Sequence, residues 1–399
     1  MAKLLFVHGG EKVKKDTLGN NYTDGSYNHE TWKRYKKLAS EITAAFRVED
    51  TIYEQRDAMS KFQPIDKDIT IIPIKDRKRS ISEYLSLKNK KYNKKLIENN
   101  VKKSDIIIAR VPSEISYYAI NFANKYNKKI LVEVVGCAFD SMWNHSIKGK
   151  ILAIPEYLKQ KHYLKKAPYA IYVSNNFLQK RYPIKGMSIG CSDVVLPSIK
   201  RNDLKNRLAR KKKETDKFIL GTVGAVNTKY KGQQYVIKAM KTLIDNGYNL
   251  EYWIIGGGDN TYLNNLTKKY HLEKNVKFTG PKNHSEIFNL IKQMDIYIQP
   301  SNAESHGRAV LEAMSVSCPC IGSSTGGIPE LVNENFIFKR KKYKDLAKKI
   351  KKMINECTAE MAIYSYEKSK QFAKSKLDKK RIDFYRKVFN NKIEDEKDS

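Results

Sequence analysis

The sequence predicts an α/β protein made of two Rossmann-like domains, each a doubly wound parallel sheet with helices on both faces. A chain of 399 residues is too long for one ordinary core and suits two domains. Short apolar runs typical of strands alternate with longer amphipathic, lysine-rich stretches typical of helices. This alternation occurs twice, before and after a basic stretch that is almost free of apolar residues.

In the first half, the apolar runs predict strands and the amphipathic stretches between them predict helices. The expected strands are Lys3–Val7, Thr70–Pro73, Asp105–Ala109, Lys129–Val135 and Ala170–Val173. The expected helices are Glu30–Ala45, Ile81–Asn99, Ile115–Tyr126 and Ile154–Lys166. Together these elements predict a first domain over residues 1–197.

The second half follows the same alternation. Its expected strands are Phe218–Val223, Leu250–Ile255, Val276–Thr279, Ile296–Gln299 and Cys320–Gly322, with helices that include Gln233–Asn246, Ser285–Lys292 and Arg308–Val316. We place a basic, solvated linker at 198–217, a second domain at 218–372 and a C-terminal helix at 373–390 that returns to the first domain. Because open α/β sheets bind ligands at the carboxyl ends of their strands, two such domains place a binding cleft between them.

The composition constrains the partners and the compartment. A formal net charge of +33 creates a field that attracts phosphate groups, whether on nucleic acid, anionic lipid or a small substrate. The five cysteines form no Cys-x-x-Cys pair, which argues against a disulfide framework. The N-terminal apolar run is too short for a signal peptide or a membrane span, so we expect a cytoplasmic protein.

The segment from Ile296 to Met314 carries the most chemistry. A strand ends at Pro300, a polar loop follows, and a helix begins near Gly307. Unpaired amide groups at a helix N-terminus favour an anion such as phosphate, and carboxylates accept hydrogen bonds from sugar hydroxyls. The amides in question belong to Ser305, His306, Gly307 and Arg308, and the carboxylates are Glu304 in the loop and Glu312 in the helix.

Glu304 and Glu312, with seven residues between them and Gln299-Pro-Ser301 before them, resemble the signature of glycosyltransferase family 4. Members of this family have the GT-B fold of two Rossmann-like domains. The resemblance covers roughly residues 218 to 332. Its further motifs, in the family's order, are Phe218–Gly224, Lys231-Gly232, Trp253–Gly258, Val276–Gly280, Asp295 and Gly322–Glu330.

The resemblance implies a role for each matching residue. Glu304 would contact the donor sugar, and Glu312 would hold the nucleotide ribose. Lys231 would bind the donor diphosphate, where an ammonium group stabilises the leaving group. The other donor-binding residues that it implies are Gly224, Lys229, Gly257, Gly280, Ser305, His306, Gly307, Arg308, Gly326 and Gly327.

The sequence departs from the family at two positions. Ala225 stands where the family usually carries Arg or Lys, so diphosphate binding would rest more on Lys231 and Arg308, with Lys229 as a candidate substitute. His306 replaces the aromatic residue that is common at its position.

In the first half the signals are weaker. Gly9 with Gly10, and Gly25 with Ser26, lie in expected loops before a helix, where glycine lets the backbone approach a ligand closely. In the family a histidine near the strand that ends about Val135 contacts the transferred sugar, and either Asp140 or His145 fills that catalytic position here. Asp66-Lys-Asp68 matches a metal-binding pattern, but it precedes an expected strand and is better explained as a surface turn, so we expect no metal.

These observations favour a retaining glycosyltransferase that uses a nucleoside diphosphate sugar, UDP-linked by resemblance, and a polyprenyl-linked glycan acceptor in surface polysaccharide biosynthesis. Two alternatives stay open. One is a nucleic-acid-binding protein, although the lysines and the 25 tyrosines are dispersed and form no recognised motif. The other is a sugar-nucleotide epimerase or a phosphorylase of the GT-B fold.

Two basic segments predict association with an anionic membrane surface. Lys88–Lys95 and Tyr157–Lys166 mix Lys with Tyr or Leu, a combination suited to the lipid headgroup layer. We therefore expect a protein that is peripherally bound to the inner face of the cell membrane.

Overall fold

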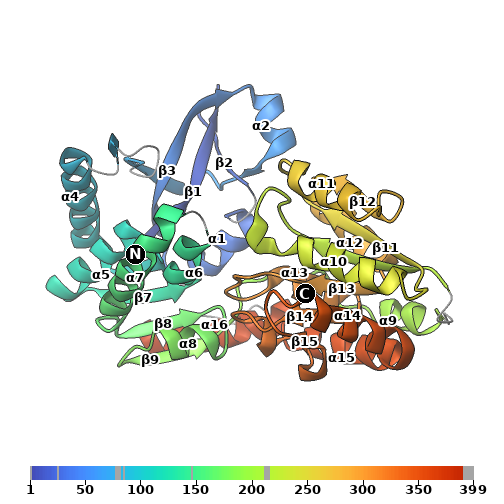
Figure 1. The fold of residues 1–399 in the computed structure, drawn as a ribbon. Coiled ribbons are helices and arrows are strands. Elements are labelled where there is room, and N and C mark those ends of the chain that lie inside the picture. Colours follow the sequence, from blue (N-terminus) through green and yellow to red (C-terminus); the bar gives the residue numbers. More distant parts are fainter. Residues whose placement is uncertain are drawn as a thin grey trace.

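The computed structural model describes residues 2–24, 27–76, 82–83, 86–144, 147–210 and 216–389. These residues form two α/β halves, each built on its own sheet (Figure 1). The first sheet has the order β4-β2-β1-β6-β7-β8-β9, with β3 beside β1 and β5 beside β3. The second has the order β12-β11-β10-β13-β14-β15. The predicted class, α/β with two Rossmann-like halves, is confirmed.

The first half contains a mainly parallel sheet, in which β2 and β4, alone among the described strands, run antiparallel to their neighbours. Its strands are β1 (Lys3–Asp16), β2 (Asn21–Thr23), β3 (Glu41–Tyr53), β4 (Gln63–Pro64), β5 (Ile69–Ile74), β6 (Ile106–Val111), β7 (Lys129–Val134), β8 (Tyr169–Tyr172) and β9 (Met187–Gly190). Its helices are α1 (His29–Lys36), α2 (Gln55–Lys61), α4 (Leu87–Lys103), α5 (Glu114–Lys125), α6 (Ala138–Trp143), α7 (Ile147–Leu164) and α8 (Phe177–Arg181).

The second half contains a sheet that is parallel throughout. Its strands are β10 (Phe218–Val223), β11 (Leu250–Ile255), β12 (Val276–Gly280), β13 (Ile296–Gln299), β14 (Cys320–Ser323) and β15 (Ile337–Phe338). Its α-helices are α9 (Arg201–Leu208), α10 (Gln233–Ile244), α11 (Thr261–Lys269), α12 (His284–Gln293), α13 (Arg308–Ser315), α14 (Tyr343–Lys352) and α15 (Thr358–Lys370). Short helical turns are η1 (Lys229–Lys231), η2 (Ile328–Glu330), η3 (Glu334–Phe336) and the π-turn η4 (Met353–Cys357), and the chain closes with α16 (Lys374–Phe389).

The helix predicted over Glu30–Ala45 is wrong in its second part. α1 covers that stretch only as far as Lys36, and residues 41–45 lie in β3, between β1 and β5. Two adjacent alanines favour a helix by propensity. The period-two burial of Ile42, Ala44 and Phe46 outweighs this propensity, because the strand is paired on both sides.

Gly9 and Gly10 lie inside β1, so the prediction of a loop before a helix is wrong for them. β1 continues past them and pairs again with β3 after a register shift between Val7 and Lys12. A Cβ atom on Gly9 would lie 2.6 Å from the Oγ atom of Ser113, so glycine permits close packing of the strand here. The other expected glycine loop, Gly25 with Ser26, lies outside the described residues.

The stretch predicted as a solvated linker contains α9, so the expectation of a loop is wrong for residues 201–208. The side chain of Arg207 is buried in α9 and donates to the backbone carbonyls of Met294, Ile291 and Lys292 at the end of α12. A side chain that satisfies three carbonyl groups at a helix C-terminus holds α9 on the second half.

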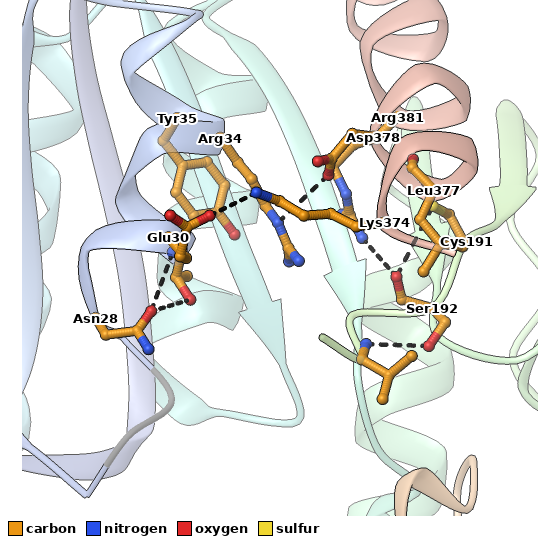
Figure 2. A network of polar contacts seen from close by, with 12 residues as sticks. Asn28, Glu30, Arg34, Tyr35, Cys191, Ser192, Lys374, Leu377, Asp378 and Arg381 are labelled. Atoms are coloured by element: carbon orange, nitrogen blue, oxygen red, sulfur yellow. Dashed lines mark hydrogen bonds and ion pairs between the residues drawn. The ribbon is translucent and has the colours of Figure 1, made fainter. Parts of the chain in front are cut away.

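The last helix, α16, packs against the first half. Lys129 in β7 donates to the carbonyl oxygen of Phe389 at 3.0 Å. Figure 2 shows α16 close to α1, with the ammonium group of Lys374 reaching the carboxylate of Glu30 at 2.7 Å. A cavity between these two helices is lined by Lys33, Arg34 and Asp378, among others. The chain therefore passes from the first half to the second and back.

A buried polar network fixes α16 in that place. The carboxylate of Glu133, on β7, accepts hydrogen bonds of 3.0 Å from the hydroxyl of Tyr35. It also forms ion pairs with Arg110 at 3.5 Å and with Arg381 of α16 at 3.6 Å. Arg381 donates to the carbonyl oxygen of Ser192 at 3.0 Å (Figure 2). The side chains of Glu133 and Arg381 are 5% and 4% exposed, so water contributes little to their solvation.

We predict that Arg381→Met lowers the free energy of unfolding by about 3 kcal/mol, because it leaves the buried carboxylate of Glu133 with one fewer cation. Chemical denaturation followed by circular dichroism measures this change. Lys380→Met, on the exposed side of the same helix, is the matched control and should change the value by less than about 0.5 kcal/mol. Equal stability of the two variants would contradict a structural role for the network.

Candidate active site

The loop between β13 and α13 carries Glu304, and neighbouring backbone holds this loop in place. The amide of Asn302 donates to the carbonyl oxygen of Tyr230 at 2.6 Å, and the hydroxyl of Ser323 donates to that of Ser301 at 2.6 Å. Gly307 adopts a left-handed conformation, with φ of 98°, directly before α13. The loop, which follows β13, is therefore anchored to η1 and to the end of β14.

Lys231 and Glu304 come together across this site. The ammonium group of Lys231, in η1, lies 3.3 Å from the carboxylate of Glu304, and both side chains are about one-fifth exposed. Gly232 follows with a φ of 82°, and a Cβ atom there would lie 2.0 Å from the carbonyl oxygen of Pro300. Glycine at that position therefore lets η1 approach the Glu304 loop. Gly224 lines the stem of Lys231, since a Cβ atom on it would lie 3.4 Å from Cδ of that side chain.

The two lysines of η1 take different directions. The ammonium group of Lys229 lies 4.4 Å from the ring centroid of Tyr262, in α11, which is a cation–π contact. Lys231 is the one that pairs with Glu304. The geometry thus brings Lys231 to the carboxylate and leaves Lys229 at the second-half helix α11.

Gly326 and Gly327 lie in a turn that packs against the backbone of Glu304. The amide of Gly327 donates to the carbonyl oxygen of Glu304 at 3.2 Å. Gly326 has a φ of 58°, and a Cβ atom there would lie 1.6 Å from that same oxygen. Only glycine fits this contact without moving the loop.

Glu312 lies farther along α13 and faces α12. Its carboxylate is 3.9 Å from Nε2 of His284, at the start of α12. The nearby carboxylate of Glu312 raises the pKa of His284, against the opposing effect of partial burial. Sequence reasoning did not select His284, because nothing in its local sequence indicates that α12 places it beside α13.

Gly257 and Gly280 lie at the carboxyl ends of β11 and β12. The amide of Val226 donates to the carbonyl oxygen of Gly257 at 3.1 Å, and the amide of Gly256 donates to that of Gly280 at 3.1 Å. Gly280 has a φ of 72°, and a Cβ atom on it would meet open space. The first of these bonds joins the turn after β11 to the turn after β10. Because β11 and β12 are parallel, Gly257 and Gly280 both lie at the carboxyl edge of the second sheet.

His306 is a contact between the two halves. Its Nε2 atom lies 2.7 Å from the hydroxyl of Ser192, and only 6% of the residue is exposed. Burial lowers the pKa of His306, although Asp193, Glu330 and Glu304 oppose this effect. Its side chain therefore points towards the first half as a neutral group, while its backbone remains beside Glu304.

Asp193, next to Ser192, is a buried carboxylate at the same contact. Burial acts to raise its pKa, but the cations Arg110, at 2.8 Å, and Arg308 lower it by a larger amount. The pKa of Asp193 consequently lies well below its ordinary value, and the group stays ionised. The exposed Arg308 is thus close enough to influence a first-half carboxylate.

Glu330 makes another contact between the halves, which sequence reasoning did not assign. Its carboxylate accepts hydrogen bonds from three consecutive amides of the first half, at 2.6, 3.1 and 2.6 Å. These amides belong to Asn175, Asn176 and Phe177, at the start of α8. A carboxylate that caps three amides is a strong, charge-assisted contact. The only sequence signal was its place at the end of the glycine-containing motif.

Of the first-half candidates, Asp140 lies in α6 and forms an ion pair with Arg181 at 3.2 Å. His145 lies outside the described residues. The part of that segment which reaches the second half is Gly136 with Cys137, since the amide of Cys137 donates to the hydroxyl of Ser305 at 3.3 Å. The structure thus links this segment to the Glu304 loop through its backbone.

A separate cavity of about 600 Å³ opens beside β1 and β3 in the first half. Gly10, one of the predicted residues, lines it, together with the basic residues Lys12, Lys14 and Arg47, which sequence reasoning missed. Acidic partners balance these charges, since Lys12 and Arg47 both pair with Asp76.

Both carboxylates of the expected surface turn at Asp66-Lys-Asp68 form ion pairs. The ammonium group of Lys36 lies 2.7 Å from both carboxylates, and His29 pairs with Asp66 at 3.0 Å. Within the described ranges, no group of three or more His, Cys, Asp or Glu residues has an arrangement that would hold a metal ion.

Comparison with known proteins relates the chain to glycosyltransferases. The family model described as "Glycosyl transferases group 1" matches residues 205–372. Protein CapJ of Staphylococcus aureus is 33% identical over 364 residues, 88% of this chain and 86% of CapJ. The capsular polysaccharide biosynthesis glycosyltransferase CapM of Staphylococcus aureus is 28% identical over 212 residues, 52% of each chain.

A shorter match and a solved structure add to this. The Escherichia coli UDP-Gal:alpha-D-GlcNAc-diphosphoundecaprenol alpha-1,3-galactosyltransferase is 31% identical over 144 residues, 35% of this chain and 36% of the relative. HepE from Anabaena, solved in complex with UDP-glucose, has a TM-score of 0.64 at 16% identity, covering 97% of this chain and 100% of HepE. The GT-B fold predicted from the sequence is confirmed.

We predict that Glu330→Ala lowers the free energy of unfolding by about 2 kcal/mol, because three amides at the start of α8 lose a charged acceptor. Glu334→Ala, an exposed acidic residue in the same segment, is the control and should leave stability within about 0.5 kcal/mol. Thermal unfolding of both variants checks this. If Glu330→Ala matched the control, the contact would not hold the halves together.

Proposed function

The chain belongs to the glycosyl transferases group 1 family, and from that premise we propose that it moves a sugar from UDP-sugar to a hydroxyl of a polyprenyl-linked glycan. The observation that carries this proposal is the pairing of Lys231 with Glu304 beside the N-terminus of α13. A cation, a carboxylate and free amides at one point suit a sugar nucleotide, which presents both phosphates and hydroxyls.

Two relatives support the choice of donor and acceptor. The Escherichia coli relative is named for a UDP-linked donor and a diphosphoundecaprenol-linked acceptor, and HepE holds UDP-glucose in its solved complex. The name of CapM supports a role in the biosynthesis of a capsule or another surface polysaccharide. In this proposal the transferred sugar is a hexose or an N-acetylhexosamine.

In the proposed reaction the bond between the sugar and the diphosphate breaks as the acceptor hydroxyl attacks from the same face of the sugar. Because attack and departure occur on the same face, the configuration of the sugar is retained. The hydroxyl proton passes to the departing diphosphate oxygen, and nucleoside diphosphate is released. Lys231, the α13 amides and Arg308 stabilise the charge that develops on that leaving group. Glu304 binds hydroxyls of the transferred sugar, and Glu312 binds the ribose.

The pairing of Lys231 with Glu304 has a consequence for donor binding. Because Lys231 is paired with Glu304 at 3.3 Å, the arriving diphosphate takes over the ammonium group while sugar hydroxyls take over the carboxylate. Each partner thus exchanges one polar contact for another, and neither is left buried and unpaired. A bound metal ion has no part in this proposal, since the protein's own cations and amides supply the positive charge.

We predict that Glu304→Gln lowers kcat by a factor of about 10² or more, because a neutral amide holds the sugar hydroxyls less strongly in the transition state. Acceptor-dependent release of UDP measures the rate. Glu312→Gln should instead raise the KM for the donor more than it lowers kcat. Turnover of Glu304→Gln at the wild-type rate would refute the assignment of the sugar site.

We predict that Lys231→Ala lowers kcat/KM for the donor by a factor of about 10² or more, because the leaving diphosphate loses its ammonium partner. Lys229→Ala, two residues away in the same turn, is the matched control and should have the milder effect, since Lys229 stacks on Tyr262. A larger loss from Lys229→Ala than from Lys231→Ala would show that this proposal assigns the diphosphate to the wrong lysine.

A further inference from the structure

Exposed apolar side chains gather on one face of the first half. Among the described residues, Trp143 at the end of α6 is 39% exposed, and four side chains of α7 are exposed by 43 to 75%. Those four are Ile151, Leu152, Ile154 and Leu158. We call these five residues the α7 face. Exposed apolar residues that stand alone are ordinary, whereas a contiguous group on one surface marks an interaction site.

The burial pattern of α7 explains why this face is apolar. The helix packs inward through Gly149, Ala153, Gln160 and Leu164. Those positions form one stripe, because residues three or four apart lie on the same side of a helix. Ile151, Ile154 and Leu158 share the opposite stripe by the same spacing, so their exposure is a property of the fold and not of a frayed end.

Lysines border the α7 face. The ammonium group of Lys150 lies 5.9 Å from the ring centroid of Trp143, and that of Lys161 lies 5.5 Å from the ring centroid of Tyr157. Lys165 and Lys166 are exposed just beyond the end of the helix. The acidic residue of α7, Glu156, is paired with Lys159 at 3.4 Å. The border of the face is therefore cationic.

The other segment predicted from the sequence to bind lipid, Lys88–Lys95 in α4, has a different character. Its lysines are mostly exposed, but Asn93 is buried and holds the backbone of Lys75 through hydrogen bonds of 2.9 and 3.0 Å. Tyr92 is stacked under the ammonium group of Lys75 at 5.6 Å. Lys88–Lys95 contains no aliphatic residue, and its one aromatic ring, that of Tyr92, is 45% exposed, so the segment lacks the group of exposed aliphatic side chains found on α7.

We propose that the α7 face docks on an anionic lipid bilayer, with its apolar side chains among the upper acyl chains and its lysines at the headgroups. Long lysine side chains can lie along apolar surface while their charges stay in the headgroup layer. The net charge of +33 and the cationic border favour an anionic surface over an apolar groove on another protein.

The position of the α7 face would let membrane docking bring a lipid-linked acceptor to the candidate active site, and this point rests on the proposed function. α6 follows directly after Cys137, whose amide contacts Ser305 beside Glu304. Figure 1 shows α6 and α7 in the first half, away from α14 and α15. A bilayer at the α7 face would therefore hold a lipid-linked acceptor near the segment that joins the two halves.

The test uses the full chain and sedimentation with vesicles of phosphatidylcholine, with and without phosphatidylglycerol. The wild-type protein should sediment with the anionic vesicles and be released by high salt. The triple variant Ile151→Ser, Ile154→Ser, Leu158→Ser should bind about tenfold more weakly or worse, because it removes apolar side chains that enter the bilayer. The matched control, Leu18→Ser, Met59→Ser, Ile363→Ser, changes apolar residues that are exposed elsewhere and should bind like the wild type.

Tryptophan fluorescence gives a second, local readout. The chain has three tryptophans, and Trp32 and Trp253 are 0% and 7% exposed, so Trp143 is the one that a bilayer can reach. Anionic vesicles should shift its emission to shorter wavelength, and Trp143→Phe should abolish the shift while binding persists.

Wild-type binding by the triple variant, or an equal loss in the control, would overturn the proposal. So would a wild-type protein that ignores the vesicles and instead forms dimers that the triple variant cannot form. Vesicle binding requires no donor, so its result stands whether or not sugar transfer is detected. Transfer to a short, water-soluble acceptor should be unchanged in the triple variant, which separates a docking defect from a failed catalytic assignment.

Discussion

The buried carboxylate of Glu133 imposes the constraint on which the arrangement of the two halves depends. With its side chain 5% exposed, it is poorly solvated by water, so protein groups must neutralise it. The groups that do so come from separate elements: Arg110 from β6, Tyr35 from α1 and Arg381 from the last helix. The ion pair between Arg381 and Glu133 therefore holds α16 on the first half, and the chain crosses between the halves a second time.

The same network continues to the candidate active site. Arg381 donates to the carbonyl oxygen of Ser192, and the hydroxyl of Ser192 meets His306, two residues from Glu304. Glu330 adds a second contact from the turn that contains Gly326 and Gly327. The backbone that would surround a donor diphosphate is thus the backbone that touches the first half. In the proposed reaction, donor binding and the contact between the halves therefore use the same stretch of backbone.

The two halves divide the work by the kind of surface they present. The second half offers strand ends, glycine turns and a helix N-terminus, which together form a polar site. The first half offers the α7 face and the segment at Cys137 that reaches Ser305. A substrate with a soluble head and a lipid tail needs both kinds of surface at once. The fold supplies them on opposite sides of one interface.

The sequence by itself determined most of the second sheet. The strands at 218–223, 250–255 and 296–299 have the predicted bounds, because a parallel strand covered on both faces is a continuous apolar run ended by turn residues. It also selected Glu304 and Lys231, which lie together. Only the tertiary structure decided that Ala44 and Ala45 belong to a strand, that Lys231 and not Lys229 meets the carboxylate, and that Glu330 joins the halves. Local sequence encodes burial and turns within a few residues, whereas these contacts link residues far apart in the chain and exist only once both sheets are packed.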